Sequence, residues 1–464
     1  MDVRKLVGVG AVLALVVGMG SGCAGGGGAP AQRAAPDAKV SVSTPAPVPG
    51  GVLPRDGYFS SPLRPQLVAI GGALKSDNSA VYQTILQGQK PDCLIVVVPF
   101  ASGDQAGAAK SSTEALRKNA PGARFETMAE VKNDAAARAK AIDQMRRADV
   151  LYFTGGDQSR ITERFMAAPA GEGEKTLLAI LKEELEKRPL VVAGTSAGAA
   201  MMSDPMFTGG GSESALGGAS KSDPADEEAD AKAAPKTTPA MPPSGPRIGA
   251  GLGLTPNIIL DTHFDARGRI GRLVAACLAS KNEFGLGISE NRAVAINGNR
   301  LKGLQDRSAV FVDVIRDQTM LPGEMYRKYI RISTINAGDE LVWGPKKSWT
   351  SVRTDATDEV RVGTMNGAIP PAPAGADERV VEGNAWGTRV FSAMLDRLAT
   401  EPQYVYVVRS AGFEVRLSAD HETTIYRRSE GRPATIIGAR LDIVTRDHAP
   451  VAPAAAEVVP RGSK

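Results

Sequence analysis

Short apolar runs alternate with longer amphipathic stretches from about residue 66 to residue 290 of this sequence. Leu94-Ile95-Val96-Val97-Val98 is apolar at every position, which is typical of a strand buried on both faces. Strands and helices that alternate in this way predict an α/β fold with a mostly parallel sheet and helices on both faces. The expected strands are 66–70, 94–98, 150–153, 190–193, 257–260 and 284–288, and the expected helices are 113–119, 135–147, 175–187 and 268–281.

Composition narrows the function classes. The chain has 464 residues, 23% of them charged, and a net charge of +4 spread over most of its length. It lacks a basic block with interleaved aromatic residues, so nucleic acid is excluded as an expected partner. Cys93 and Cys277 lie in apolar segments and are expected as two buried thiols, and no cysteine or histidine spacing indicates a metal site. We expect no cofactor.

The N-terminus has the pattern of an export signal. Arg4 and Lys5 precede an apolar stretch, 6–17, that is short for a membrane span. Gly20-Ser21-Gly22-Cys23 resembles a bacterial lipobox, which predicts lipidation of Cys23, membrane anchoring and a location in the cell envelope. Such boxes usually carry an aliphatic residue where Gly20 stands, so plain secretion is the alternative.

The remaining organisation follows from composition. We expect an export signal (1–22), a Gly-, Ala- and Pro-rich flexible tether (23–55), a main α/β domain (56–345) with a low-complexity insertion (209–246), a linker (346–383), a small C-terminal α+β domain (384–448) and a tail (449–464). The small domain is expected to contain a helix at 390–398 and strands at 404–408, 414–417 and 439–444. Its function and that of the insertion are not visible in the sequence, which also leaves the oligomeric state open, a dimer included.

One strand end carries the pattern of a nucleophile. Gly194-Thr195-Ser196-Ala197-Gly198 joins an apolar strand to an Ala-rich helix, with glycine two places either side of the serine. In such a turn, the Ala197 amide is placed to bind an oxyanion, and Gly155-Gly156, at another strand end, is a candidate for the second donor. The alternatives are a turn with a capping serine and a phosphate-binding loop.

A serine nucleophile usually needs a base, and the chain has only three histidines. His421 and His448 fall in the predicted C-terminal domain, which leaves His263, just past the expected strand 257–260. The orienting carboxylate is Glu290, Asp261 or an acid of the insertion. Arg269 and Arg272 follow His263 at helical spacing, and guanidinium groups there favour binding of substrate carboxylates.

Five motifs in order resemble the cyanophycinases, relatives of the aspartyl dipeptidase called peptidase E. They span residues 66–343 and are Phe153-Thr154-Gly155-Gly156-Asp157-Gln158, Gly194-Thr195-Ser196-Ala197-Gly198-Ala199, Gly251-Leu252-Gly253-Leu254, His263-Phe264-Asp265 through Arg269-Ile270-Gly271-Arg272, and Gly285-Leu286-Gly287-Ile288-Ser289-Glu290-Asn291.

The resemblance implies a flavodoxin-like fold akin to class I glutamine amidotransferases. It also implies a serine peptidase that hydrolyses cyanophycin, a poly-aspartate with arginine on its side chains, to β-aspartyl-arginine dipeptides. By position, Ser196 is then the nucleophile, His263 the base and Glu290 the orienting acid. Substrate-binding positions are matched by Gln158, Asp261, Arg267, Arg269 and Arg272.

Some features depart from the family pattern. Thr262 stands where the family usually has glutamine before the histidine, and the insertion, the N-terminus and the final domain lie outside the shared core. Two other functions therefore stay open. One is an aspartyl or isoaspartyl dipeptidase with the same machinery, and the other is a non-catalytic surface binding protein.

Overall fold

The structure is a computed structural model. It describes residues 64–131, 134–169, 173–217, 245–280, 282–314, 326–344, 347–353, 358–361, 378–410, 412–420, 422–428 and 431–445, all within one compact unit. The predicted export signal, Cys23, the tether and the tail lie outside the described residues. Among the helices that are described, none is long and apolar enough to cross a bilayer.

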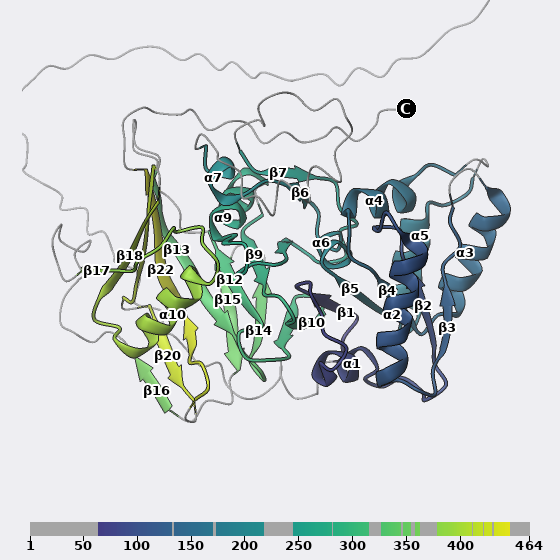
Figure 1. Ribbon diagram of the computed structural model, residues 1–464, viewed down its shortest axis with the longest axis horizontal. Helices are drawn as coiled ribbons and strands as arrows, with labels where there is room; N and C mark the ends of the chain where they lie inside the picture. The colour runs from purple at the N-terminus through teal and green to yellow at the C-terminus, as the bar shows by residue number, and fades with distance from the viewer. Residues whose placement is uncertain are drawn as a thin grey trace, which may run out of the picture. The chain divides into compact units, whose positions relative to one another are not determined.

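The first sheet has a parallel half and an antiparallel half (Figure 1). The parallel half has the order β3 (Arg124–Thr127), β2 (Leu94–Val98), β4 (Val150–Phe153), β5 (Val191–Thr195), β1 (Leu67–Ile70). The antiparallel half continues from β1 with β10 (Ala293–Asn297), β11 (Arg300–Gly303), β14 (Glu340–Gly344) and β15 (Lys347–Arg353). The predicted α/β class with a flavodoxin-like parallel sheet is confirmed.

Helices cover both faces of the parallel half. α1 (Ser79–Ile85) and α2 (Gln105–Asn119) share one core with the sheet, and α3 (Ala135–Arg147), α4 (Gln158–Met166) and α5 (Leu177–Lys187) share the other. Side-chain oxygens of Asp104, Asp134, Asp157 and Thr176 accept hydrogen bonds from backbone amides in the first turns of α2 to α5. These caps explain where the helices start.

The bounds predicted from the apolar pattern lie close to the observed bounds of these strands and helices. β2, β4 and α3 have the predicted bounds, and β1 and β5 differ by one or two residues. The sequence missed β3, an edge strand whose residues are all partly or fully exposed. A strand without a buried face leaves no hydrophobic periodicity to detect.

A second sheet corrects one expectation. It has the order β17 (Glu378–Val380), β18 (Val405–Ser410), β19 (Phe413–Ser418), β22 (Ala439–Thr445), β13 (Tyr326–Ile335), β12 (Ala309–Asp313), β9 (Phe284–Ile288), β8 (Ile258–Asp261). The strands predicted at 257–260 and 284–288 are therefore β8 and β9, and the expectation that they share a sheet with β5 is wrong. Both are buried on two faces, and burial alone does not specify which sheet a strand joins.

The C-terminal region completes this second sheet. β22 pairs with β13 along its length, and α10 (Val390–Thr400) shares a core with α9 (Ile270–Ser280), β12 and β13. β15, β16 (Asp358–Arg361) and β17 fall inside the segment expected to be a linker. A three-stranded sheet, β16-β20-β21, adds β20 (Thr424–Arg427) and β21 (Thr435–Ile437). The predicted domain boundaries stay a prediction.

Smaller elements border the predicted insertion. They are α6 (Ala197–Ala200), β6 (Met206–Gly209), α7 (Ser212–Ala215) and β7 (Arg247–Gly249), with β6 and β7 paired. α7 lies within the range predicted as low complexity, and it is held because the Ser212 hydroxyl donates to the Gly268 carbonyl at 2.7 Å.

The two sheets meet where β1, β8 and β9 end. The His263 amide donates to the Gly71 carbonyl at 2.7 Å, and the Phe264 amide donates to the Ile288 carbonyl at 3.1 Å. Alternate residues of β8, Ile258 and Leu260, pack into the core of the first sheet. The ends of strands from both sheets thus form one small region, which contains the candidate site.

Candidate active site

Ser196 lies in a sharp turn between β5 and α6. Its backbone has φ 53° and ψ −115°, a left-handed conformation that is costly for a residue with a side chain. The turn is tight because a Cβ on Gly194 would overlap the Gly198 carbonyl group. The predicted nucleophile elbow is therefore present, and it presents the Ser196 hydroxyl beyond the end of β5.

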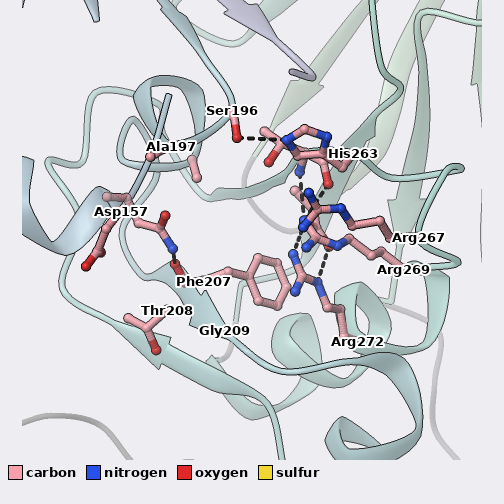
Figure 2. A pocket seen from close by; sticks show the side chains of 15 residues that line it. Asp157, Ser196, Ala197, Phe207, Thr208, Gly209, His263, Arg267, Arg269 and Arg272 are labelled. Atoms are coloured by element: carbon pink, nitrogen blue, oxygen red, sulfur yellow. Dashed lines mark hydrogen bonds and ion pairs between the residues drawn. The ribbon is translucent and has the colours of Figure 1, made fainter. Parts of the chain in front are cut away.

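His263 faces this serine from the other sheet. Its Nε2 lies 2.8 Å from the Ser196 Oγ, as Figure 2 shows. His263 also has a left-handed backbone, with φ 50°. The close packing of Gly72 positions the ring, since a Cβ there would overlap the imidazole. Strained backbone of this kind persists only where surrounding contacts over-determine it.

Glu290 completes a chain of three side chains. Its Oε1 lies 2.6 Å from His263 Nδ1. The turn that carries it is held to the end of β1, because the Asn291 amide donates to the Gly72 carbonyl at 2.8 Å and Asn78 Nδ2 donates to the Asn291 carbonyl at 2.9 Å. Of the acids left open by the sequence, Glu290 contacts the imidazole, and Asp261 is buried against arginines instead.

The surroundings favour a neutral imidazole. Burial lowers the pKa of His263 below its ordinary value of 6.5, and the charges of Arg267 and Arg269 lower it further, whereas the hydrogen bond to Glu290 raises it. With Nε2 accepting the Ser196 hydroxyl proton, Nδ1 carries the ring proton and donates it to Glu290. At neutral pH His263 is therefore in the form that can take a proton from Ser196.

Two amides are candidates for binding an oxyanion. Ala197 follows the nucleophile directly, and Gly156 lines the same pocket as Ser196. Among the described residues, turns, loops and helix caps form backbone hydrogen bonds of their own. Neither the Ala197 amide nor the Gly156 amide is a donor in any of these. The adjacent Gly155 packs against Ser196, with its Cβ position 3.4 Å from the serine Cβ. Both predicted donors thus lie near the nucleophile.

A pocket of ≈ 90 Å³ opens beside Ser196 and His263. It brings together every substrate-binding residue predicted from the sequence: Gln158, Asp261, Arg267, Arg269 and Arg272. Figure 2 shows the three arginines lying on the His263 side, with Phe207 facing Arg272. The pocket is therefore lined with positive charge next to the nucleophile.

The arginines differ in their environment. The Asp261 carboxylate is fully buried and accepts from Arg272 Nε at 2.8 Å and Arg272 Nη2 at 2.5 Å. Arg269 Nη1 donates to the Thr262 carbonyl at 2.7 Å. Arg267 is the least buried of the three. Asp261 and Arg272 thus form a buried bidentate ion pair that shapes the wall, while Arg267 is more open to the pocket.

The opposite wall comes from residues that sequence reasoning missed. Phe207, Thr208 and Gly209 of β6 line the pocket, and Gln158 Nε2 donates to the Phe207 carbonyl at 2.5 Å. The Phe207 ring lies 4.5 Å from the Arg272 guanidinium carbon. β6 carries no sequence motif. Its place at the pocket could therefore have been predicted only from its pairing with β7.

The predictions about cysteine and metals concern other parts of the molecule. Cys93 and Cys277 are free and buried, as predicted. Among the residues that the structure describes, no three His, Cys, Asp or Glu side chains are grouped to hold a metal ion. His421 and His448 are outside the described residues.

Comparisons with known proteins show what this region is similar to. The model of peptidase family S51 matches residues 67–222, which include Gly156 and Ser196. The cyanophycinase of Trichormus variabilis is 32% identical over 164 residues, covering 35% of this chain and 44% of that protein. The cyanophycinase of Synechococcus elongatus is 26% identical over 182 residues, covering 39% of this chain and 47% of that protein. The predicted resemblance to this family is confirmed.

The similarity covers part of each protein. The chain spans less than half the length of the curated relatives it matches. Among solved structures, a crystal structure of a peptidase from an acI-B1 Actinobacterium matches with 16% identity and a TM-score of 0.36, covering 60% of this chain and 96% of that one.

Proposed function

We propose that this chain, whose residues 67–222 match peptidase family S51, is a serine peptidase that hydrolyses cyanophycin to β-aspartyl-arginine dipeptides. The observation that carries the proposal is the aligned chain Ser196 Oγ, His263 Nε2, His263 Nδ1, Glu290 Oε1, with separations of 2.8 Å and 2.6 Å. These side chains come from two sheets and meet at one pocket, which is the geometry required of nucleophile, base and orienting acid.

In the acylation step, Ser196 Oγ attacks the carbonyl carbon of an aspartyl peptide bond while its proton passes to His263 Nε2. The resulting imidazolium is stabilised by Glu290. The negative carbonyl oxygen is bound by the amides of Ala197 and Gly156. When the C–N bond breaks, His263 Nε2 returns the proton to the leaving amine, and Ser196 keeps the acyl group as an ester.

Deacylation repeats these steps with water. His263 takes a proton from the water, whose oxygen attacks the ester carbonyl, and then returns a proton to Ser196 Oγ as the ester bond breaks. The products are a free carboxylate and the regenerated hydroxyl. The low pKa of His263 keeps the base available at neutral pH.

Substrate choice is assigned to the arginine wall. Carboxylates pair well with guanidinium groups. In cyanophycin the aspartyl side-chain carboxyls carry arginine, so the carboxylates available for pairing are those of the attached arginines and of the chain end. Arg267 is proposed as the direct contact because it is the least buried of the three arginines that line the pocket. Gln158 is proposed to contact the substrate from the facing side.

The deciding experiment compares wild type with Ser196→Ala on insoluble cyanophycin. Wild type is expected to release soluble β-aspartyl-arginine, and the variant is not. Ser111→Ala on the exposed face of α2 is the matched control, because it removes a hydroxyl far from the pocket. Active protein that releases no β-aspartyl-arginine would exclude cyanophycin as the substrate.

A small acidic dipeptide is the second candidate substrate. The pocket is lined by three arginines, which suits the carboxylates of a short aspartyl or isoaspartyl peptide. Turnover of such dipeptides without release from the polymer would favour it.

A non-catalytic binding protein is the third candidate function. It would be favoured by unchanged hydrolysis in Ser196→Ala together with a failure of active-serine probes to label Ser196.

Export and lipidation of Cys23 also belong to the proposal. They rest on the sequence pattern of residues 1–23 alone. Wild type is expected in the membrane fraction of an expressing bacterium, and Cys23→Ser is expected to lose that association. Equal membrane association of both proteins would refute lipid anchoring through this cysteine.

A further inference from the structure

Residues 264–271, called here the base loop, run from His263 into the first turn of α9. Besides the contacts of Phe264 with Ile288 and of Gly268 with Ser212, this loop is held by residues 384–392 in the C-terminal region, called here the clamp segment. The Arg389 amide donates to the Asp265 carbonyl at 3.0 Å, and Thr388 Oγ1 donates to the Ala266 carbonyl at 2.8 Å. The Thr388 side chain is exposed, so this contact lies at the surface of the molecule.

The clamp segment also packs closely on the base loop. A Cβ on Gly268, whose φ is 55°, would overlap the Trp386 carbonyl, and one on Gly271 would crowd the Trp386 ring. The Trp386 ring in turn meets Phe413 of β19 edge-on, with centroids 5.9 Å apart. The base loop therefore lies against the C-terminal region without space for a larger residue at these positions.

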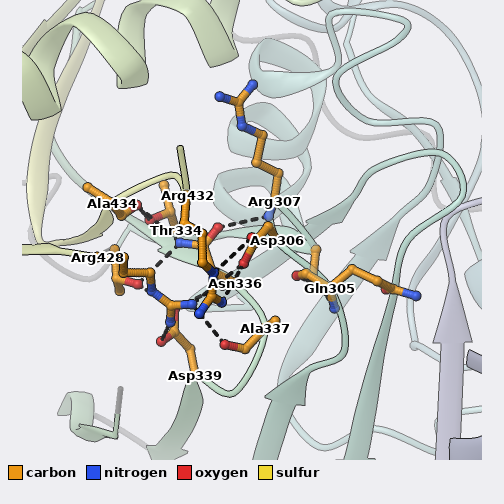
Figure 3. Close-up of polar contacts among 12 residues, drawn as sticks. Gln305, Asp306, Arg307, Thr334, Asn336, Ala337, Asp339, Arg428, Arg432 and Ala434 are labelled. Carbon is orange, nitrogen blue, oxygen red and sulfur yellow. Dashed lines mark hydrogen bonds and ion pairs between the residues drawn. The ribbon is translucent and has the colours of Figure 1, made fainter. Parts of the chain in front are cut away.

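The C-terminal region is itself firmly anchored. Arg428, beside β20, forms an almost fully buried ion pair with Asp339, and Arg428 Nη1 donates to the Ala337 carbonyl at 2.9 Å (Figure 3). Asp339 Oδ2 accepts from Thr435 Oγ1 at 2.6 Å. A buried ion pair holds neighbouring segments in one arrangement, because separation would leave a charge without a partner in the interior.

A second set of contacts reaches the turn that carries Glu290. Figure 3 shows Arg432 beside Asp306, and its Nη2 lies 2.9 Å from Asp306 Oδ1. The Asp306 carbonyl accepts from Arg292 Nε at 2.9 Å. The C-terminal region thus contacts the neighbourhood of both His263 and Glu290, which are the proposed base and the carboxylate that orients it.

Resting on the proposed function, we propose that the clamp segment is a positioning element for the catalytic base. Thr388, acting through its hydrogen bond to the Ala266 carbonyl, is its principal positioning residue. The left-handed backbone of His263 requires support from outside its own strand, and the clamp segment supplies that support two residues further along. On this proposal the C-terminal region completes the peptidase rather than being an independent unit.

The proposal has a specific consequence for the pH profile. The groups that act on His263 are Glu290, which raises its pKa, and Arg267 and Arg269, which lower it together with burial. On this proposal, a looser base loop allows the His263–Glu290 contact, 2.6 Å in this structure, to lengthen. The pKa of His263 then falls further, and the rate of serine attack falls because the reacting atoms are misaligned.

The test measures labelling of Ser196 by a fluorophosphonate probe, as a function of pH, with the full-length protein. Thr388→Ala is compared with wild type, with the conservative variant Thr388→Ser, and with Thr400→Ala. Thr400 is the matched control because its hydroxyl donates within α10, to the Asp396 carbonyl, away from the base loop. Melting temperatures are measured alongside.

Thr388→Ala is expected to slow labelling about three- to tenfold and to move its midpoint to lower pH. Thr388→Ser should restore both, and Thr400→Ala should change neither. If Thr388→Ala does not fold, Thr388→Val, which also lacks the hydroxyl, takes its place. Labelling of the clamp variants at the wild-type rate and midpoint would overturn the inference. Failure of wild type to label at Ser196 would refute the proposed function, and the inference with it.

Discussion

Ser196 and His263 are held by two regions built in different ways. The serine stands at the end of β5, in a turn whose neighbours in the sequence, Gly194 and Ala197, supply most of what it needs. The histidine stands at the end of β8, in another sheet, and its orientation depends on Gly72, Glu290 and the clamp segment. One position is therefore determined locally and the other by long-range contacts.

The difference indicates where substitutions should act. Changes around Ser196 should abolish chemistry and leave the other region intact, whereas distant changes can misplace His263. The predictions below test this contrast, in order of decreasing effect.

Ser196→Ala is expected to lower kcat by about 10⁴- to 10⁶-fold, since the nucleophile is lost and only binding and the oxyanion site remain. The thermal unfolding curve should match that of wild type, because the turn keeps its glycines. Hydrolysis assays with purified protein measure the first effect, and calorimetry measures the second. Residual activity near the wild-type level would show that Ser196 is not the nucleophile.

Glu290→Gln is expected to lower kcat about 10²- to 10⁴-fold, because an amide cannot stabilise the imidazolium and can select the wrong ring tautomer. The pKa of His263 should fall, because the hydrogen bond and charge that raise it are removed. A pH series of kcat/KM checks both effects. An unchanged pH profile of kcat/KM would show that Glu290 is not the orienting acid.

Gly72→Ala tests whether a residue outside the motifs places the base. A methyl group there would push the His263 ring, so kcat is expected to fall about 100-fold. Gly88→Ala is the matched control. Gly88 also has a left-handed backbone, with a φ of 80° where Gly72 has 97°, but a Cβ on Gly88 would meet no atom within 4 Å. Both variants should lose about 1 kcal/mol or more of stability from backbone strain. Similar activity of the two would contradict the role assigned to Gly72.

The pH dependence is the smallest expected effect. Because the pKa of His263 lies below 6.5, kcat/KM should rise with pH and reach half its maximum below pH 6.5. Arg267→Ala should move that midpoint upward, because a nearby positive charge that disfavours the imidazolium is removed. Probe labelling of Ser196 measures the shift without involving the substrate contact. A downward shift would contradict the assigned electrostatics.

Much of the site could be read from local pattern. Ser196, its flanking glycines and the oxyanion amide of Ala197 follow from a strand-turn-helix segment, whose geometry depends on neighbours in the chain. The expected bounds of β2, β4 and α3 were confirmed for the same reason. By contrast, β6 at the pocket wall has no motif, and Gly72 is one glycine among 51.

By itself, the sequence determined the kind of fold, the nucleophile turn and the set of charged residues near the pocket, because these depend on periodicity, glycine placement and residue chemistry. Only the tertiary structure decided that β8 and β9 join a second sheet, that Glu290 rather than Asp261 meets His263, and that the C-terminal region holds the base loop. Each of these depends on which buried surfaces pack together, and an apolar strand or a carboxylate does not encode its partner.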